Sequence, residues 1–181
     1  MRSIVDGPKD GRVILLTFIL AMAVYFAMVF GTLAQLERIA GDRPFDLRPA
    51  GYSFDDAATF IAALGEEGRR LYLWRQIPLD TVYPALLALW SAGAIRWFSK
   101  GFPPAPKRWF HAAASLAFAA ALFDYLENVF IVWMLNTAPD LNPAIVTAAS
   151  LATLAKSGFA TVVFTAVVLS MIVFLFSRLR G

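Results

Sequence analysis

Apolar residues fall in four long blocks, and polar residues gather in the segments between them. The blocks cover residues 13–34, 79–97, 109–135 and 143–177. A helix needs about 20 apolar residues to cross the hydrocarbon core of a bilayer, and the blocks lack the strict alternation of a membrane strand. The pattern therefore predicts an all-α integral membrane protein, a bundle of four transmembrane helices that forms one domain over residues 1–181.

The connection between the first two blocks, residues 35–78, is too long for a bare loop. Ser53 precedes Asp56 by three residues, which is the pattern of a capping box at a helix start. Apolar residues then follow at helical spacing in one stripe: Phe54, Ala57, Ala58, Ile61 and Leu64. We expect an amphipathic helical outer loop between spans 1 and 2, interrupted at GEEGRR, with Tyr72 and Trp74 at headgroup level.

Basic residues predict the orientation. Lys and Arg occur in the N-terminal tail, in the second connection around residues 96–108 and after the last block, whereas the third connection, NTAPDLNP, has none. Under the positive-inside rule both termini face the cytoplasm, in what we expect to be a bacterial inner membrane. Small residues at 32–34 fit a signal-peptide cleavage site, but the apolar run is about twice the usual length, so we interpret the first block as a retained span.

Composition narrows the function classes. The chain is 59% hydrophobic and 16% charged, which is too apolar for an ordinary soluble domain. The net charge of +3 comes without a basic run that has interleaved aromatics, so nucleic-acid binding has no support. The absence of Cys excludes thiolate chemistry. With one His and no phosphate-binding glycine motif, we expect no cofactor and no metal, and a hard cation held by carboxylates is the minor alternative.

Charged residues interrupt the apolar blocks at a common depth. Asp124, Glu127 and Asn128 share one face of the third block. Counting about 1.5 Å per residue from the expected cytoplasmic interface places these acids, Asp80 and Lys156 about 22–30 Å away. Because ionised groups are costly in lipid, such residues turn inward and seek partners. We predict that they meet in an acidic pocket near the outer leaflet, with Lys156 as countercharge.

The candidate site combines two sets of residues. Asp124 and Glu127 are the catalytic candidates if the protein is an enzyme. The candidate ligand-binding residues are Asp80, Tyr83, Asn128, Lys156, Ser157 and Arg75.

Asp80 has two interpretations. If it caps the second helix, Pro84 falls in the first turns and is tolerated there. If the helix begins nearer Pro78, Pro84 removes the helical hydrogen bond to the Asp80 carbonyl and leaves a free acceptor. The second arrangement is typical of a binding site.

Small residues predict which helices touch. The third block contains many alanines, and the fourth contains alanines together with Gly158. Small side chains let membrane helices approach closely. We therefore expect the third and fourth spans to pack together and to bring Lys156 to Asp124 or Glu127.

Three functions fit this sequence. The first is binding of a membrane lipid or a small amphipathic ligand, or an accessory role in a homo-oligomer or larger membrane complex. The second is an intramembrane enzyme of isomerase or hydrolase type that uses the paired carboxylates as general acid and base, and the third is proton- or ion-coupled transport. A purely structural network is the competing explanation. Four spans with buried acids resemble in architecture the EXPERA group of sterol isomerases and sterol-binding proteins, a resemblance that assigns no residue a role.

Overall fold

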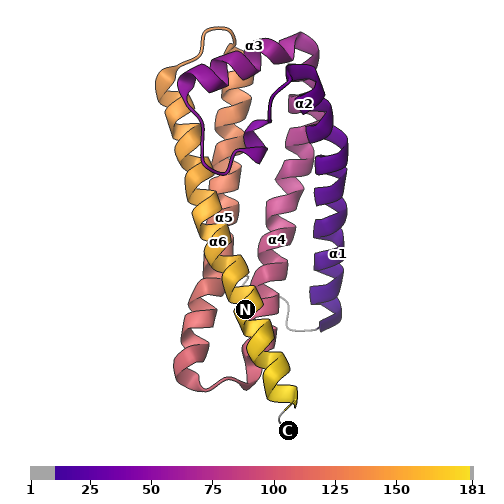
Figure 1. The fold of residues 1–181 in the computed structure, drawn as a ribbon, viewed down its shortest axis with the longest axis vertical. Helices are drawn as coiled ribbons and strands as arrows, with labels where there is room; N and C mark the ends of the chain where they lie inside the picture. The colour runs from indigo at the N-terminus through magenta and orange to yellow at the C-terminus, as the bar shows by residue number, and fades with distance from the viewer. Residues whose placement is uncertain (1–10, 180–181) are drawn as a thin grey trace, which may run out of the picture.

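The computed structural model describes residues 11–179, which are helical almost throughout and contain no strand. Long helices run side by side along an elongated bundle, and α3 lies across one end of it (Figure 1). The elements in chain order are α1 (Gly11–Ala27), η2 (Met28–Leu33), α2 (Ala34–Ala40), η3 (Phe45–Leu47), α3 (Phe54–Leu71), η4 (Tyr72–Gln76), α4 (Ile77–Phe98), η5 (Ser99–Gly101), α5 (Pro104–Thr137) and α6 (Pro143–Leu179). Of the short elements, η2 and η4 are π-helical, and η3 and η5 are 3₁₀ turns.

Three helical segments are long and apolar enough to cross a membrane: Gly11–Ala40, Pro104–Thr137 and Pro143–Leu179. Large apolar side chains cover their outer faces, and Phe30 is 75% exposed. Soluble monomers rarely expose such continuous apolar surface. The prediction of a helical, membrane-type protein is confirmed, and the three helices suggest a membrane location.

The predicted second span corresponds to α4, which is not one of these three segments. Asp80, Tyr83 and Ser91 lower its hydropathy. The helix nonetheless packs against α1, α5 and α6, as Figure 1 shows for its place beside α1. It is therefore an inner helix of the bundle.

The observed helices extend beyond the predicted apolar blocks. The first helix runs on through η2 and α2 to Ala40, where we expected the connection to begin at residue 35. It ends at Gly41, whose φ of 69° suits glycine and whose amide donates to the Glu37 carbonyl at 2.8 Å. The polar residues of α2 continue the helix because backbone hydrogen bonding does not require an apolar side chain.

The amphipathic helix in the connection is present as α3. Ser53 and Asp56 form the predicted capping box, each side chain accepting from the other's backbone amide. In the predicted stripe, Ala57, Ile61 and Leu64 are buried, whereas Phe54 is 39% exposed. The break predicted at GEEGRR occurs at Gly65, whose φ is 59°, and the helix then resumes.

A loop of this connection folds back against α6. The Tyr52 amide donates to Ser150 Oγ at 2.9 Å, and Phe45 is fully buried with its ring 4.6 Å from the ring of Tyr52. Gly51 has φ 77°, and a Cβ there would lie 2.7 Å from Ser150 Oγ. Only glycine suits this close, left-handed position. The contact holds η3, and with it Asp46, against the bundle.

The bundle has two cores of different composition. Near α3 the core contains large side chains such as Leu36, Phe60 and Met134. Toward the other end it is built mainly from small residues of α4, α5 and α6: Ala88, Ala92, Ala114, Ala117, Ala121, Val163 and Ala166. The predicted close packing of α5 on α6 is confirmed, but Gly158 has no neighbour within 4 Å of a built Cβ. Gly158 therefore does not bring the α6 backbone close to a neighbouring helix.

Candidate functional site

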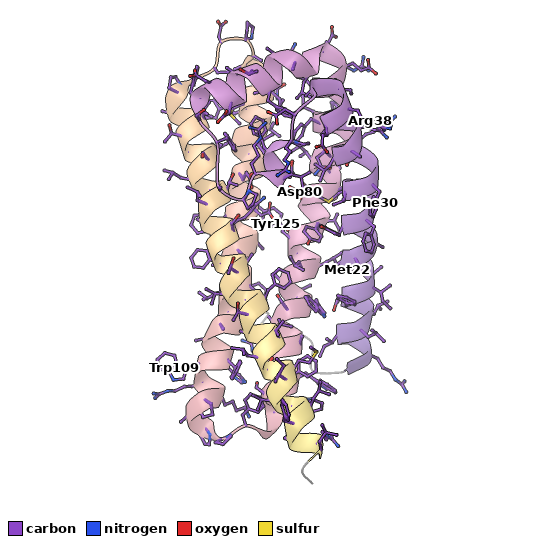
Figure 2. All side chains as sticks on the ribbon, viewed as in Figure 1. Met22, Phe30, Arg38, Asp80, Trp109 and Tyr125 are labelled. Atoms are coloured by element: carbon purple, nitrogen blue, oxygen red, sulfur yellow. The ribbon has the colours of Figure 1, made fainter. Side chains whose placement is uncertain are left out.

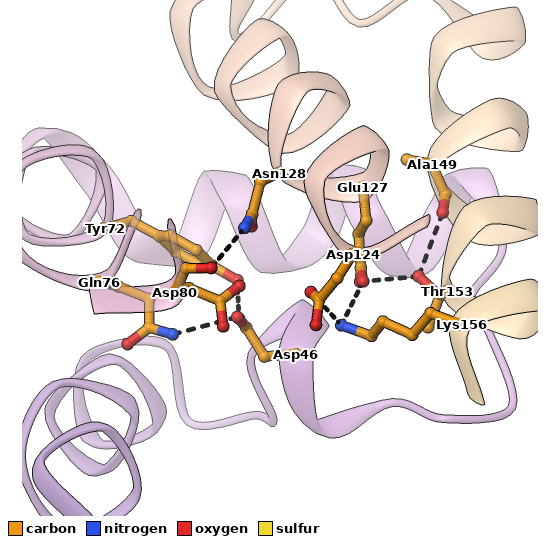
Figure 3. A network of polar contacts seen from close by, with 10 residues as sticks. All are labelled: Asp46, Tyr72, Gln76, Asp80, Asp124, Glu127, Asn128, Ala149, Thr153 and Lys156. Atoms are coloured by element: carbon orange, nitrogen blue, oxygen red, sulfur yellow. Dashed lines mark hydrogen bonds and ion pairs between the residues drawn. The ribbon is translucent and has the colours of Figure 1, made fainter. Parts of the chain in front are cut away.

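The candidate site is a group of buried and half-buried polar side chains in the half of the bundle nearest α3, and we call it the polar cluster. Figure 3 shows its members at close range. They are Asp46, Tyr72, Gln76, Asp80, Asp124, Glu127, Asn128, Thr153 and Lys156.

Lys156 joins α6 to α5 within this cluster. Its Nζ lies 3.1 Å from Asp124 Oδ1 and forms a second ion pair with Glu127 Oε2. Thr153 Oγ1 donates to Glu127 Oε1 at 2.7 Å. The pairs 124/127 and 153/156 are each three residues apart, so each pair shares one helix face. Packing of the two faces brings the four side chains together.

The connection between α2 and α4 supplies a second part of the cluster. The Tyr72 hydroxyl donates to Asp46 Oδ2, and Gln76 Nε2 donates to Asp46 Oδ1 at 3.1 Å. Thr32 in turn donates to Gln76 Oε1. Asp46 is thus held through both carboxylate oxygens.

Pro84 explains how Asn128 enters the cluster. Helix α4 begins at Ile77, so Asp80 lies inside it and does not cap it, and Pro84 also lies inside. Proline cannot donate to the carbonyl four residues before it, and Asn128 Nδ2 donates to the Asp80 carbonyl instead, at 3.2 Å. The helix start of the second interpretation is therefore observed, but the Asp80 carbonyl is not left as a free acceptor, because Asn128 occupies it.

The cluster contains more acids than bases. Asp46, Asp80, Asp124 and Glu127 lie in it, and Lys156 is the base that the described contacts place among them. Glu127 and Asp80 are only 1% and 3% exposed. Buried charge without compensation is costly, so the cluster favours a cationic or hydrogen-bond-donating group.

Two buried acceptors in the cluster lack a protein partner. Asp80 Oδ2 and Asn128 Oδ1 make no hydrogen bond to any residue in the described part of the chain. An unsatisfied buried acceptor costs about 1–3 kcal/mol. A donor from a bound molecule would relieve this cost.

Tyr72 in the cluster and Tyr52 beside it keep their phenol protons over a wide pH range. Burial raises the pKa of Tyr72, and the neighbouring Asp46 carboxylate raises it further. Burial likewise raises the pKa of Tyr52, and the charge of Glu127 adds to the effect. Both phenols thus stay protonated beside the acids.

A small hollow between α4, α5 and α6 reaches the edge of the cluster. Its volume is about 50 Å³, against the about 10–15 Å³ that one water needs. Asp124 and Lys156 line it, and their side chains are 14% and 16% exposed. Small or apolar residues line the rest, among them Pro84, Ala88, Ala117, Ala121, Ala160 and Phe164.

Three of the predicted ligand-binding residues lie apart from these contacts. The Tyr83 ring packs 5.8 Å from the ring of Tyr25. Ser157 is half-buried next to Lys156, and its backbone carbonyl accepts from Thr161 at 2.8 Å. Arg75 is exposed and lines a separate surface hollow.

Sequence reasoning missed Asp46, Tyr72 and Gln76. The interpretation of Tyr72 as a headgroup-level residue is wrong, because it is fully buried, whereas Trp74 is 78% exposed. The four-residue spacing of Tyr72 and Gln76 was an available signal, since it places both side chains on one helix face. Nothing in the local sequence marks Asp46 as part of the cluster.

Within residues 11–179, no three His, Cys, Asp or Glu side chains are arranged to hold a metal ion. Comparisons with protein-family models, with curated proteins and with solved structures give no match. A function must therefore be inferred from the residues and their geometry.

Proposed function

We propose that this chain is a four-span membrane protein that binds a lipid or another small amphipathic ligand at the polar cluster. In this proposal α4 is the second span, the connection containing α3 lies on the outer face, and both termini face the cytoplasm, as expected for a bacterial inner membrane. The apolar outer faces of the helices and the basic residues at the end opposite α3 support this placement. The cluster then lies in the outer half of the bilayer.

One observation carries the proposal: the hollow between α4, α5 and α6 combines a reachable ion pair with a floor of small apolar residues. Asp124 and Lys156 are partly exposed there, whereas Glu127 behind them is 1% exposed. A polar headgroup would exchange hydrogen bonds with Asp124 and Lys156, and an apolar tail would lie along the alanines toward lipid. Binding sites commonly pair a few polar groups with an apolar wall.

A catalytic form of the same site would use Asp124, not Glu127. Glu127 is held by Lys156 and Thr153 and has almost no exposure. Asp124 lines the hollow, so a substrate could reach it for proton transfer. Chromatography with mass spectrometry of the added ligand after incubation distinguishes the two forms, because a hydrolase would change the mass of the ligand and an isomerase would change its retention time.

Native mass spectrometry of the gently solubilised protein, with identification of bound lipid, tests the proposal. Ala160→Leu fills the hollow without altering the polar cluster and should remove the bound molecule while the protein stays folded. Ala148→Leu is the matched control, because this half-buried alanine of α6 does not line the hollow. Retention of the ligand in the Ala160 variant, or no ligand on the wild type, would leave the cluster with only a structural role.

A further inference from the structure

A second hollow lies at the end of the bundle opposite α3, between η5, the start of α5 and the last turns of α6. Its volume is about 540 Å³. Two basic residues, Lys100 and Arg178, line it together with a set of rings: Trp97, Phe98, Phe102, Phe110 and Phe174. Among the lining residues within 11–179, none is acidic.

The rings hold the two cations in place. Lys100 Nζ lies 5.9 Å from the centre of the Trp97 ring, and the Arg178 guanidinium lies 5.4 Å from the Phe174 ring. The Trp97 and Phe174 rings are themselves 5.3 Å apart. Cation–π contacts of this length attract the charge to the ring face. The two positive charges are therefore anchored on neighbouring rings at one hollow.

The distribution of charge along the chain strengthens this local picture. Segments 81–123 and 141–179 contain no Asp or Glu, and at this end of the bundle they supply five basic residues: Arg96, Lys100, Lys107, Arg108 and Arg178. The acids of the described chain lie instead in α2, in the connection to α4, in the polar cluster and near residue 140. Within residues 11–179, the two segments that line the second hollow therefore carry basic residues and no acid.

We infer that this hollow binds the phosphate of an anionic phospholipid. Arg178 presents a fork of donors that suits phosphate oxygens, and Lys100 adds a point charge. The aromatic lining suits the headgroup zone, and the exposed Val173 and Phe176 would contact the acyl chains. A free phosphate ion would gain nothing from these apolar surfaces. The second hollow is separate from the polar cluster, so a test that rejects ligand binding at one of them leaves the other proposal standing.

The test is a native mass spectrometry titration of the full-length, delipidated protein with phosphatidylglycerol and, separately, with phosphatidylcholine. The wild type should prefer the anionic lipid. Lys100→Gln with Arg178→Gln should weaken phosphatidylglycerol binding by about tenfold relative to the control, which is the scale expected for basic contacts at an anionic surface.

The matched control is Lys107→Gln with Arg108→Gln. It removes the same charge at the same end of the bundle, but neither residue lines the hollow, and Arg108 lies 5.0 Å from the ring of the exposed Trp109. Figure 2 shows Trp109 pointing away from the bundle. The control should bind phosphatidylglycerol nearly as the wild type does.

Three results would overturn the inference. These are equal binding of the two lipids by the wild type, equal losses in the site and control variants, and full competition by inorganic phosphate at the same concentration as the lipid. If the double variant does not fold, Lys100→Arg with Arg178→Lys keeps the charges and should retain the preference, whereas Lys100→Gln alone should reduce it.

Discussion

The helices pack by different contacts in the two halves of the bundle. Near α3 the helices are joined by large side chains and by a network in which one lysine meets two acids. In the other half, alanines bring the backbones close together, and the buried Ser91 bonds only within its own helix, to the Leu87 carbonyl at 2.7 Å. The half near α3 thus joins its helices through specific polar contacts, which a site requires and simple packing does not.

The largest expected effect is at Lys156. Lys156→Met leaves Asp124 and Glu127 without their cation, and removing one partner of a buried ion pair costs about 3–5 kcal/mol. Reversible unfolding by SDS in mixed micelles measures this change in free energy of unfolding. Ser91→Ala, from the other half, is the control and should change stability by less than about 0.5 kcal/mol because its hydroxyl bonds within its helix.

A triple variant sharpens this result. Neutralising the partners as well, with Asp124→Asn and Glu127→Gln added to Lys156→Met, should recover part of the lost stability because no unpaired charge remains. If Lys156→Met alone costs less than about 1 kcal/mol, the ion pairs do not join the helices.

The next prediction compares the stability lost when each of the two acids that Lys156 contacts is neutralised. Glu127→Gln should cost about 2 kcal/mol, since Glu127 is almost fully buried and also accepts from Thr153. Asp124→Asn should cost about 1 kcal/mol, because Asp124 is 14% exposed at the hollow and water can replace part of its interaction. The same unfolding titration compares them, and a reversed order would contradict the assigned depths.

An effect of similar size to that of the single acid variants is expected at Gly51, which holds the loop against α6. Gly51→Ala places a side chain in a left-handed conformation, at a cost of roughly 1–2 kcal/mol, and directs its Cβ toward Ser150 Oγ. The loop that carries Asp46 should then move, so protease cleavage near residues 43–52 should become faster. Unchanged cleavage would mean that the loop is not tied to α6 at this point.

The smallest effect is the pH dependence of α3. Hydrogen bonds from the Ser53 side chain and then from its backbone lower the pKa of Asp56 below its ordinary value of 3.8. The folded-state pKa is the lower one, so the stabilisation is present above pH 3.8 and is lost as pH falls through the folded value. Amide hydrogen exchange at the start of α3 should show this loss, and Asp56→Asn should abolish its pH dependence.

The sequence predicts the helical class from its apolar blocks, and it predicts the meeting of Lys156 with the acids from their common depth and from the small residues of the two helices. Apolar blocks define long helices, and a three-residue spacing puts Asp124 and Glu127 on one face whatever the tertiary fold. The role of Pro84 was predictable for the same reason, since a proline always removes the bond four residues before it. Such local rules do not depend on how the helices pack together.

The parts that could not be predicted depend on long-range packing. Asp46 enters the cluster because Phe45 is buried and Gly51 rests on Ser150. Tyr72 was expected at the headgroups because Tyr and Trp side chains both suit that zone, yet Tyr72 is buried and Trp74 is exposed. Rotation of a helix about its axis is set by its neighbours, and no local pattern specifies it.

The meeting of Lys156 with Glu127 inside the bundle can be measured directly by solid-state NMR in lipid bilayers. A sample with ¹⁵Nζ-lysine and ¹³Cδ-glutamate should show strong dipolar dephasing of one glutamate carboxyl carbon, and Glu127→Gln should remove that signal. Glutamate carboxyl carbons without dephasing, or dephasing that survives in the variant, would contradict the pairing and with it the proposed site.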